Sequence, residues 1–136
     1  AWPSPPPTEP CPAVGERPTM VGMALSLGMV TTDSTDPRPL AQWWADRFGG
    51  EIVADHDGWF VIVKIDKVML GFQKVDGPTP GKNRLHLDLH VDTDLDAAVQ
   101  EFLDAGATLV GDRGDESFRW ITLADPQGNQ SCVAGD

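Results

Sequence analysis

One stretch in the second half of the chain alternates apolar and polar residues without a break. Its apolar positions are Leu85, Leu87, Leu89 and Val91, and the polar positions between them are His86, Asp88 and His90. Because side chains of a strand point to opposite faces in turn, the pattern predicts a strand over 85–91 with one apolar and one polar face. Two imidazoles on either side of a carboxylate are unusual for a merely solvated strand, so the polar face is the first candidate for chemistry.

The first half of the chain predicts a strand, a helix and three further strands. A strand over 24–32 comes first, and Asp36 then suits the N-cap of a helix that begins with proline. The apolar stripe of this helix consists of Leu40, Trp43, Trp44 and Phe48. Gly49 ends the helix. The strands after it are predicted over 51–54, 59–65 and 68–73. Glycine and proline in 75–83 predict a linker.

The second half predicts the same order again. The strand over 85–91 is followed by a helix that begins at about Asp94 and ends at Gly106. The apolar face of this helix is formed by Leu95, Ala98, Val99, Phe102 and Leu103. The later strands are predicted over 108–111, 118–124 and 130–134. A turn over 125–129 joins the last two.

This order amounts to an internal repeat. The glycines that end the two helices, Gly49 and Gly106, lie 57 residues apart (106 − 49), and the same offset places Met29 opposite His86. Two such modules, over about 24–74 and 84–134, bury a helix against one side of each sheet. The other side is left free to curve round a cavity.

Length and charge narrow the class of protein. The 136 residues suit one domain with a real core, which we place over 20–136. The net charge of −11 argues against nucleic acid and anionic membranes as partners, because phosphate binding requires a basic surface. No apolar run is long enough to span a bilayer. The proline-rich residues 1–19 predict a disordered tail whose removal should barely change the melting temperature.

Two cysteines are present, Cys11 in the tail and Cys132 in the last predicted strand. A disulfide between them is not expected, and a reduced cytoplasmic protein is the simpler prediction. The sequence contains no serine-hydrolase elbow, P-loop, dinucleotide fingerprint or Cys-x-x-Cys zinc pair.

Four stretches together resemble the vicinal oxygen chelate superfamily, which includes glyoxalase I, extradiol dioxygenases and bleomycin-resistance proteins. They are Leu85–Asp92, Asp94–Val99, Ala105–Ala107 and Leu123–Asn129. The closest likeness is to its glyoxalase-like domain branch, and it covers about residues 24–134. The resemblance implies an α+β fold in which two βαβββ modules form an eight-stranded, U-shaped open barrel. It also implies a small-molecule ligand and a homodimer.

Metal-using members of this superfamily take four ligands, usually His, Gln or Glu, from four strands. The matching positions here are Met29, Gly71 with Gln73 next on its face, His86 and Cys132. Only His86 clearly fits, because neither a thioether nor a glycine can hold a hard metal. We therefore expect no metal cofactor, apart from weak zinc binding by His86 and Cys132.

His86 and Asp88 are the candidate catalytic residues, with His86 as the acid or base and Asp88 as the group that orients it. The competing interpretation is that His86 is an ordinary strand histidine, hydrogen-bonded to a neighbour. A paired partner for Asp88 is expected, either Arg119 or a histidine. The candidate ligand-binding residues are Met29, Trp59, Phe72, Gln73, His90, Trp120 and Cys132. For the aromatic residues, the alternative is ordinary packing in the core. Cys132 could instead be an inert buried thiol, and His90 could lie outside the cavity.

The sequence leaves the function open between two main hypotheses. The first is a small-molecule-binding protein of the glyoxalase/bleomycin-resistance type, which holds an apolar or aromatic ligand in the concave sheet cavity without an essential metal. The second is an enzyme, a lyase, isomerase or dioxygenase, that uses His86 as acid/base or metal ligand. A structural or interaction module with a filled cavity is a third possibility, because one fold hosts many functions.

Overall fold

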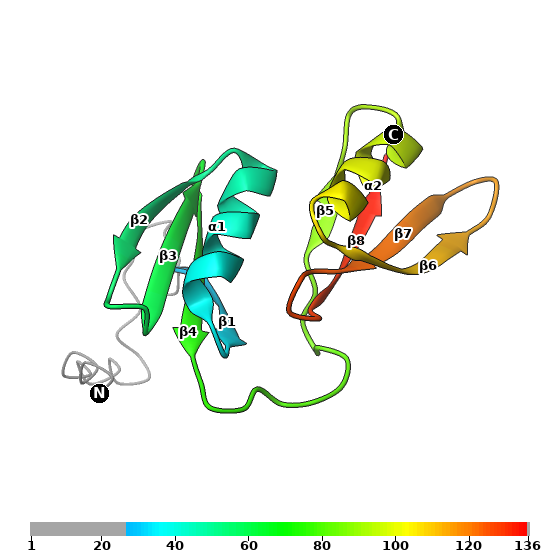
Figure 1. The fold of residues 1–136 in the computed structure, drawn as a ribbon. Coiled ribbons are helices and arrows are strands. Elements are labelled where there is room, and N and C mark those ends of the chain that lie inside the picture. Colours follow the sequence, from blue (N-terminus) through cyan, green and yellow to red (C-terminus); the bar gives the residue numbers. More distant parts are fainter. Residues whose placement is uncertain (1–26, 136) are drawn as a thin grey trace, which may run out of the picture.

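The structure is a computed structural model that describes residues 27–135. Its first module consists of β1 (Val30–Ser34), α1 (Pro37–Phe48), β2 (Glu51–Asp55), β3 (Phe60–Ile65) and β4 (Val68–Lys74). Its second module consists of β5 (Asp88–His90), α2 (Leu95–Asp104), β6 (Thr108–Gly114), β7 (Arg119–Ala124) and β8 (Gln130–Ala134). The predicted order βαβββ therefore occurs twice (Figure 1). The tail 1–19 and the start of the strand predicted over 24–32 lie outside the described residues.

Each module forms one four-stranded mixed sheet. The strand orders are β1-β4-β3-β2 and β5-β8-β7-β6, and in both the first strand runs parallel to the last. The common strand order confirms the internal repeat. Thr31 pairs with Gly71 in the first sheet, and Asp88, at the equivalent position of the second, pairs with Cys132. The fold is therefore α+β with two βαβββ modules, as predicted. Within the described residues, no helix is long and apolar enough to cross a membrane.

Helix α1 begins and ends where the sequence predicts. Pro37 occupies its first turn, and Gly49 ends it with a left-handed φ of 65°, which glycine adopts without steric cost. The buried face of the helix is formed by Pro37, Leu40, Ala41, Trp44 and Ala45. This face covers Val61, Val63, Leu70 and Phe72 of the first sheet, and together these side chains form the core of the first module.

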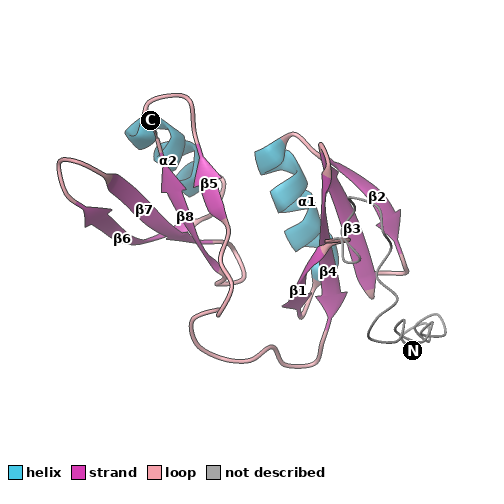
Figure 2. Cartoon of the chain, turned by 180° about the vertical axis from the view of Figure 1, so that it is seen from behind, coloured by secondary structure: helices cyan, strands magenta, loops and turns pink. Residues whose placement is uncertain are grey.

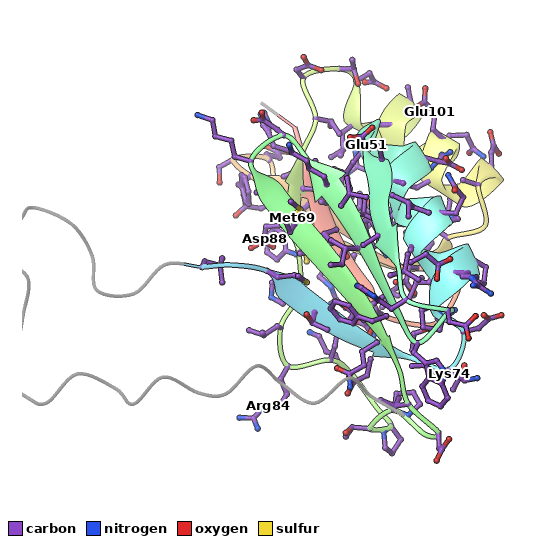
Figure 3. All side chains as sticks on the ribbon, turned by 90° about the vertical axis from the view of Figure 1, so that its left-hand side faces the viewer. Glu51, Met69, Lys74, Arg84, Asp88 and Glu101 are labelled. Carbon is purple, nitrogen blue, oxygen red and sulfur yellow. The ribbon has the colours of Figure 1, made fainter. Side chains whose placement is uncertain are left out.

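Helix α1 also contacts the second module, and the two helices lie in the space between the two sheets (Figures 1 and 2). Leu87 and Leu89 pack against the first core, and the Nε1 atom of Trp44 donates a hydrogen bond to Asp125 Oδ2 at 3.1 Å. The helix-covered sides of both sheets are therefore directed inward. The uncovered sides, here called the first and second open faces, point to opposite sides of the chain, and Figure 3 looks onto the first of them.

The strand expected over 85–91 is shorter than the alternation suggests. Only Asp88–His90 form β5, and its ladder reaches back no further than the hydrogen bond from Cys132 N to Leu87 O. Leu85 was expected on the packed face, but its side chain is 83% exposed. It precedes the paired residues and follows the linker, so nothing holds it against the helices.

Leu87→Ala is expected to lower the free energy of unfolding by about 2 kcal/mol, toward the lower end for leucine truncation because Leu87 is only partly buried. Leu85→Ala is the matched control, and we expect a change within about 0.5 kcal/mol because the side chain is exposed. Urea denaturation of both variants measures the difference. Equal effects would show that the two leucines have the same environment.

Candidate functional site

The second open face aligns the polar residues of the second module in two rows across neighbouring strands. One row consists of Asp88, Cys132, Thr122 and Gly111, and the next consists of His90, Ala134, Trp120 and Arg113. His86 lies two residues before Asp88 and comes from the segment that leads into β5. The alternation along four strands thus gathers most of the residues singled out from the sequence on one surface.

Three potential ligand groups converge at the edge of this face. The Nδ1 atom of His86 lies 3.1 Å from Asp88 Oδ1, and one ligand atom each of His86, Asp88 and Cys132 all lie within 4.8 Å of one another. The side chains of His86 and Asp88 are 41% and 78% exposed, so the group is open to solvent. The partner of Asp88 is thus a histidine, one of the two partners expected.

Arg119, the other expected partner, belongs to the opposite side of β7. Its guanidinium pairs with Asp112 at 2.7 Å and with Asp96 of α2 at 2.9 Å. The hydrogen bond from Arg119 holds the pKa of Asp112 below its ordinary value, and the same bonds raise the pKa of Arg119. Arg119 therefore ties β7 to the helix and takes no part in the site.

The cation of the site is Arg113, which the sequence analysis missed together with Thr122. The Nε atom of Arg113 donates a hydrogen bond to Thr122 Oγ1 at 3.1 Å, and that hydroxyl lies 3.7 Å from Cys132 Sγ. A Cβ on Gly111 would meet the Arg113 guanidinium at 3.1 Å, so the glycine leaves room for it. No pattern in the sequence marked Arg113, because it lies beyond the strand predicted over 108–111, and only the pairing of β6 with β7 places it directly opposite Trp120.

An aromatic surface adjoins this cation. The rings of Phe118 and Trp120 lie 5.7 Å apart between centroids at an angle of 34°, and Phe118 is 58% exposed. His90 lies in the same row as Trp120, separated by Ala134. Tilted aromatic pairs of this kind offer ring faces and edges on which a planar group can stack.

The first open face carries Met29 and Gly71 where the second has His86 and Cys132, and it carries Thr31 and Asp33 where the second has Asp88 and His90. A Cβ on Gly71 would meet Met29 Sδ at 2.5 Å, and both Phe60 Cζ and Thr31 Oγ1 at 2.8 Å. Met29 therefore lies across the glycine and fills the space where a ligand side chain could stand. Gln73 is on the same face, half-buried and paired between Asp33 and Phe60.

Two of the proposed ligand-binding aromatics lie elsewhere. Phe72 is 2% exposed in the core under α1, because alternation along β4 turns it away from Gly71 and Gln73. It therefore does not join the other candidates on an open face. Trp59 is 41% exposed just before β3, and the Nζ atom of Lys74 lies 5.0 Å from its ring centroid.

A cavity of about 480 Å³ lies between the modules, bounded by β1 and by the segment that leads into β5. Its apolar lining includes Val30, Trp44, Leu70, Phe72 and Leu87. Arg84 and His86 also border it. This space extends along the helix-covered sides of the sheets, and at its edge it meets His86, which also belongs to the cluster with Asp88 and Cys132.

The four positions that would hold a metal in the superfamily do not form one centre in this chain. Met29 and Gly71 offer no hard-metal ligand, and they lie on an open face directed away from His86 and Cys132. On the second open face, however, imidazole, carboxylate and thiol are all groups that bind zinc. Asp88 lies beside His86 and Cys132, the two donors expected from the sequence.

Comparisons with known proteins agree with this fold. A family model described as a glyoxalase-like domain matches residues 29–134. Similar solved structures include a glyoxalase/bleomycin resistance protein/dioxygenase family enzyme from Burkholderia phytofirmans, with 20% identity, a TM-score of 0.67, and coverage of 79% of this chain and 95% of the other.

Two further structures are similar to this chain at comparable levels. The fosfomycin resistance protein FosX from Listeria monocytogenes has 13% identity, a TM-score of 0.68, and coverage of 84% and 95%. A lactoylglutathione lyase from Agrobacterium tumefaciens has 19% identity, a TM-score of 0.61, and coverage of 83% and 96%. A search of curated proteins returned no match. At such identities these likenesses concern the fold.

Proposed function

This chain belongs to the glyoxalase-like domain family, and from that premise we propose that it is a small-molecule-binding protein of the glyoxalase/bleomycin-resistance type. The ligand is an apolar or aromatic molecule that stacks on the second open face. The observation that carries the proposal is the aromatic pair Phe118 and Trp120 beside the guanidinium of Arg113. Ring faces supply contact area, and a few polar groups fix the orientation of the ligand.

The polar groups of the face narrow the class of ligand. Arg113 offers N–H donors that bind a carboxylate or phenolate, and it shares a row with Trp120. The thiol of Cys132 and the hydroxyl of Thr122 occupy the next row. We therefore propose a planar aromatic ligand that carries an acidic or hydroxyl group.

A second copy of the chain is expected to complete the site. The second open face is uncovered in one chain, and the first open face, where Met29 and Phe60 contact the position of Gly71, is directed away from it (Figures 1 and 3). We propose a homodimer in which the first open face of one copy covers the second open face of the other, so that Met29 and Gln73 join the ligand-binding residues. Light scattering of the purified chain measures the mass, and a monomer at micromolar concentration contradicts this arrangement.

A fluorescence-quenching screen with planar antibiotics and aromatic metabolites tests ligand binding. A ligand is expected to quench tryptophan emission saturably, and Trp120→Ala and Arg113→Gln should each weaken its affinity by at least about tenfold, which is the loss of about 1.4 kcal/mol of binding energy. Trp59→Phe is the control, because Trp59 lies at the edge of the other module.

Two outcomes would contradict the proposal. The first is that no compound of the screen quenches saturably. The second is a ligand whose affinity is unchanged in Trp120→Ala but is lost in Val30→Trp, which fills the cavity between the modules. The second result would move the binding site to that cavity.

An enzyme is the second candidate function, and the His86–Asp88 contact of 3.1 Å favours it. A carboxylate at Nδ1 fixes the tautomer of an imidazole and leaves Nε2 to exchange a proton with a substrate. Turnover of a bound compound that is lost in His86→Ala and kept in His90→Ala supports a lyase or isomerase. Equal loss in both variants assigns no special role to His86.

A further inference from the structure

We propose that the second open face holds a zinc ion through His86, Asp88 and Cys132. The inference goes beyond the proposed function, which requires no metal. It rests on the convergence of three different donor groups within 4.8 Å of one another. The set differs from the four positions used across the superfamily, because Asp88 replaces the ligands that the first module lacks.

The sheet brings the three donors together without any rearrangement of the backbone. His86 and Asp88 are two residues apart, so their side chains point to the same side of the chain. Cys132 pairs directly with Asp88 on the neighbouring strand β8, so its side chain points to that side too. A metal bound here therefore bridges β5 and β8 at the point where their ladder begins.

The chemistry of the donors selects zinc over harder cations. Zinc accepts nitrogen, oxygen and sulfur ligands, whereas magnesium and manganese prefer oxygen. One carboxylate and one thiolate would neutralise the two charges of the ion, and the net charge of −11 favours cations at the surface. Three protein ligands leave one position for water or for an oxygen of a ligand, as in zinc sites that take part in catalysis.

The residues around Cys132 support a metal-binding thiolate. Thr122 is only 3% exposed, and its hydroxyl lies 3.7 Å from Cys132 Sγ and accepts a hydrogen bond from Arg113. Hydrogen bonds of this kind around a first ligand orient it and tune its affinity for a metal. Arg113→Gln should therefore also weaken zinc binding, although it removes no ligand.

Zinc titration of the full chain tests the site. Untagged protein is first freed of metal with a chelator, and competition with a chromophoric chelator then gives stoichiometry and affinity. We expect about one zinc per chain, with manganese bound far more weakly. His86→Ala, Asp88→Asn and Cys132→Ser should each weaken zinc binding by at least about tenfold.

Matched variants separate this site from other ligands in the chain. His90→Gln removes a histidine from the same strand, and Cys11→Ser removes the thiol of the tail, so both should keep zinc. Circular dichroism of each metal-free variant shows whether the fold survives. Cobalt provides a readout that does not depend on activity, because a thiolate-to-cobalt band should appear in the parent protein and disappear in Cys132→Ser.

The outcomes of the titration are decisive. Zinc at trace level, equal loss in His90→Gln, or a cobalt band that persists in Cys132→Ser each overturn the proposal. If a ligand from the fluorescence screen still quenches tryptophan emission in zinc-free protein, the proposed ligand-binding function holds without the metal site. Conversely, if the titration shows zinc binding but the screen finds no ligand, the metal site is supported and the proposed ligand-binding function is contradicted.

Discussion

Asp125→Ala is expected to lower the free energy of unfolding by about 3–5 kcal/mol, because it leaves the buried Trp44 indole N–H and two part-buried backbone N–H groups without an acceptor. Asp125 is 6% exposed. Its Oδ2 accepts from Trp44 Nε1 at 3.1 Å, and its Oδ1 accepts from the backbone N–H groups of Gln127 at 2.9 Å and Asn129 at 3.1 Å. The carboxylate therefore closes its own turn and joins the second module to helix α1. Urea denaturation monitored by circular dichroism measures the loss.

A double-mutant cycle separates the two roles of this carboxylate. Asp125→Asn keeps one oxygen for the turn but places an amide opposite the Trp44 indole N–H, so it should lose only the bond between the modules. Trp44→Phe removes the same bond from the other side. The effects of these two substitutions should be clearly less than additive, with a coupling of about 1 kcal/mol or more. Additive effects would mean that the 3.1 Å contact contributes nothing to stability.

The pH dependence of stability gives a second signature of Asp125. Burial raises the pKa of its carboxyl above the ordinary Asp value, although the hydrogen bonds it accepts oppose this shift. The folded state therefore holds the proton more tightly than the unfolded state, and this contribution to stability is present at low pH and lost as pH rises through the raised pKa. The difference between the parent protein and Asp125→Asn should fall over that acidic window and stay constant above it. A difference that rises with pH would contradict the buried position.

Features that depend on neighbouring residues could be predicted from the sequence. The end of α1 at Gly49 follows from the left-handed φ that glycine adopts, and the second βαβββ order follows from the repeat. The shared face of Asp88 and His90 follows from strand alternation. Each of these statements needs only local geometry or the internal symmetry of the chain.

Features that depend on the placement of distant segments could not be predicted. The bond between Trp44 and Asp125 joins residues 81 positions apart, and no periodic pattern marks it. Arg119 lies in the strand predicted over 118–124, whereas Arg113 lies beyond the strand predicted over 108–111, which extends to Gly114 in the structure. Only the observed β6–β7 pairing shows that Arg113 faces the site and Arg119 faces α2. Leu85 follows the alternation but precedes the ladder, so pattern alone assigned it to the wrong environment.

Phe72→Ala is expected to lower the free energy of unfolding by about 3–5 kcal/mol, the range for a fully buried phenylalanine. Phe72 is 2% exposed, and its ring packs among the side chains that α1 covers. Its removal forfeits the apolar contacts of the ring and enlarges the space between the modules, since Phe72 already borders the 480 Å³ cavity. Chemical denaturation should show a lower midpoint with a similar slope.

Phe118→Ala is the matched control, because the same side chain is removed from a position that is 58% exposed. Its effect on unfolding should stay within about 0.5 kcal/mol, whereas its effect on the affinity of a stacked ligand should be large. Phe72→Ala should show the reverse, with affinity kept wherever the variant is folded. A small stability loss in Phe72→Ala together with lost affinity would instead place the ligand in the cavity between the modules, where Phe72 and His86 border the same space. The two phenylalanines thus decide between the second open face and the cavity between the modules.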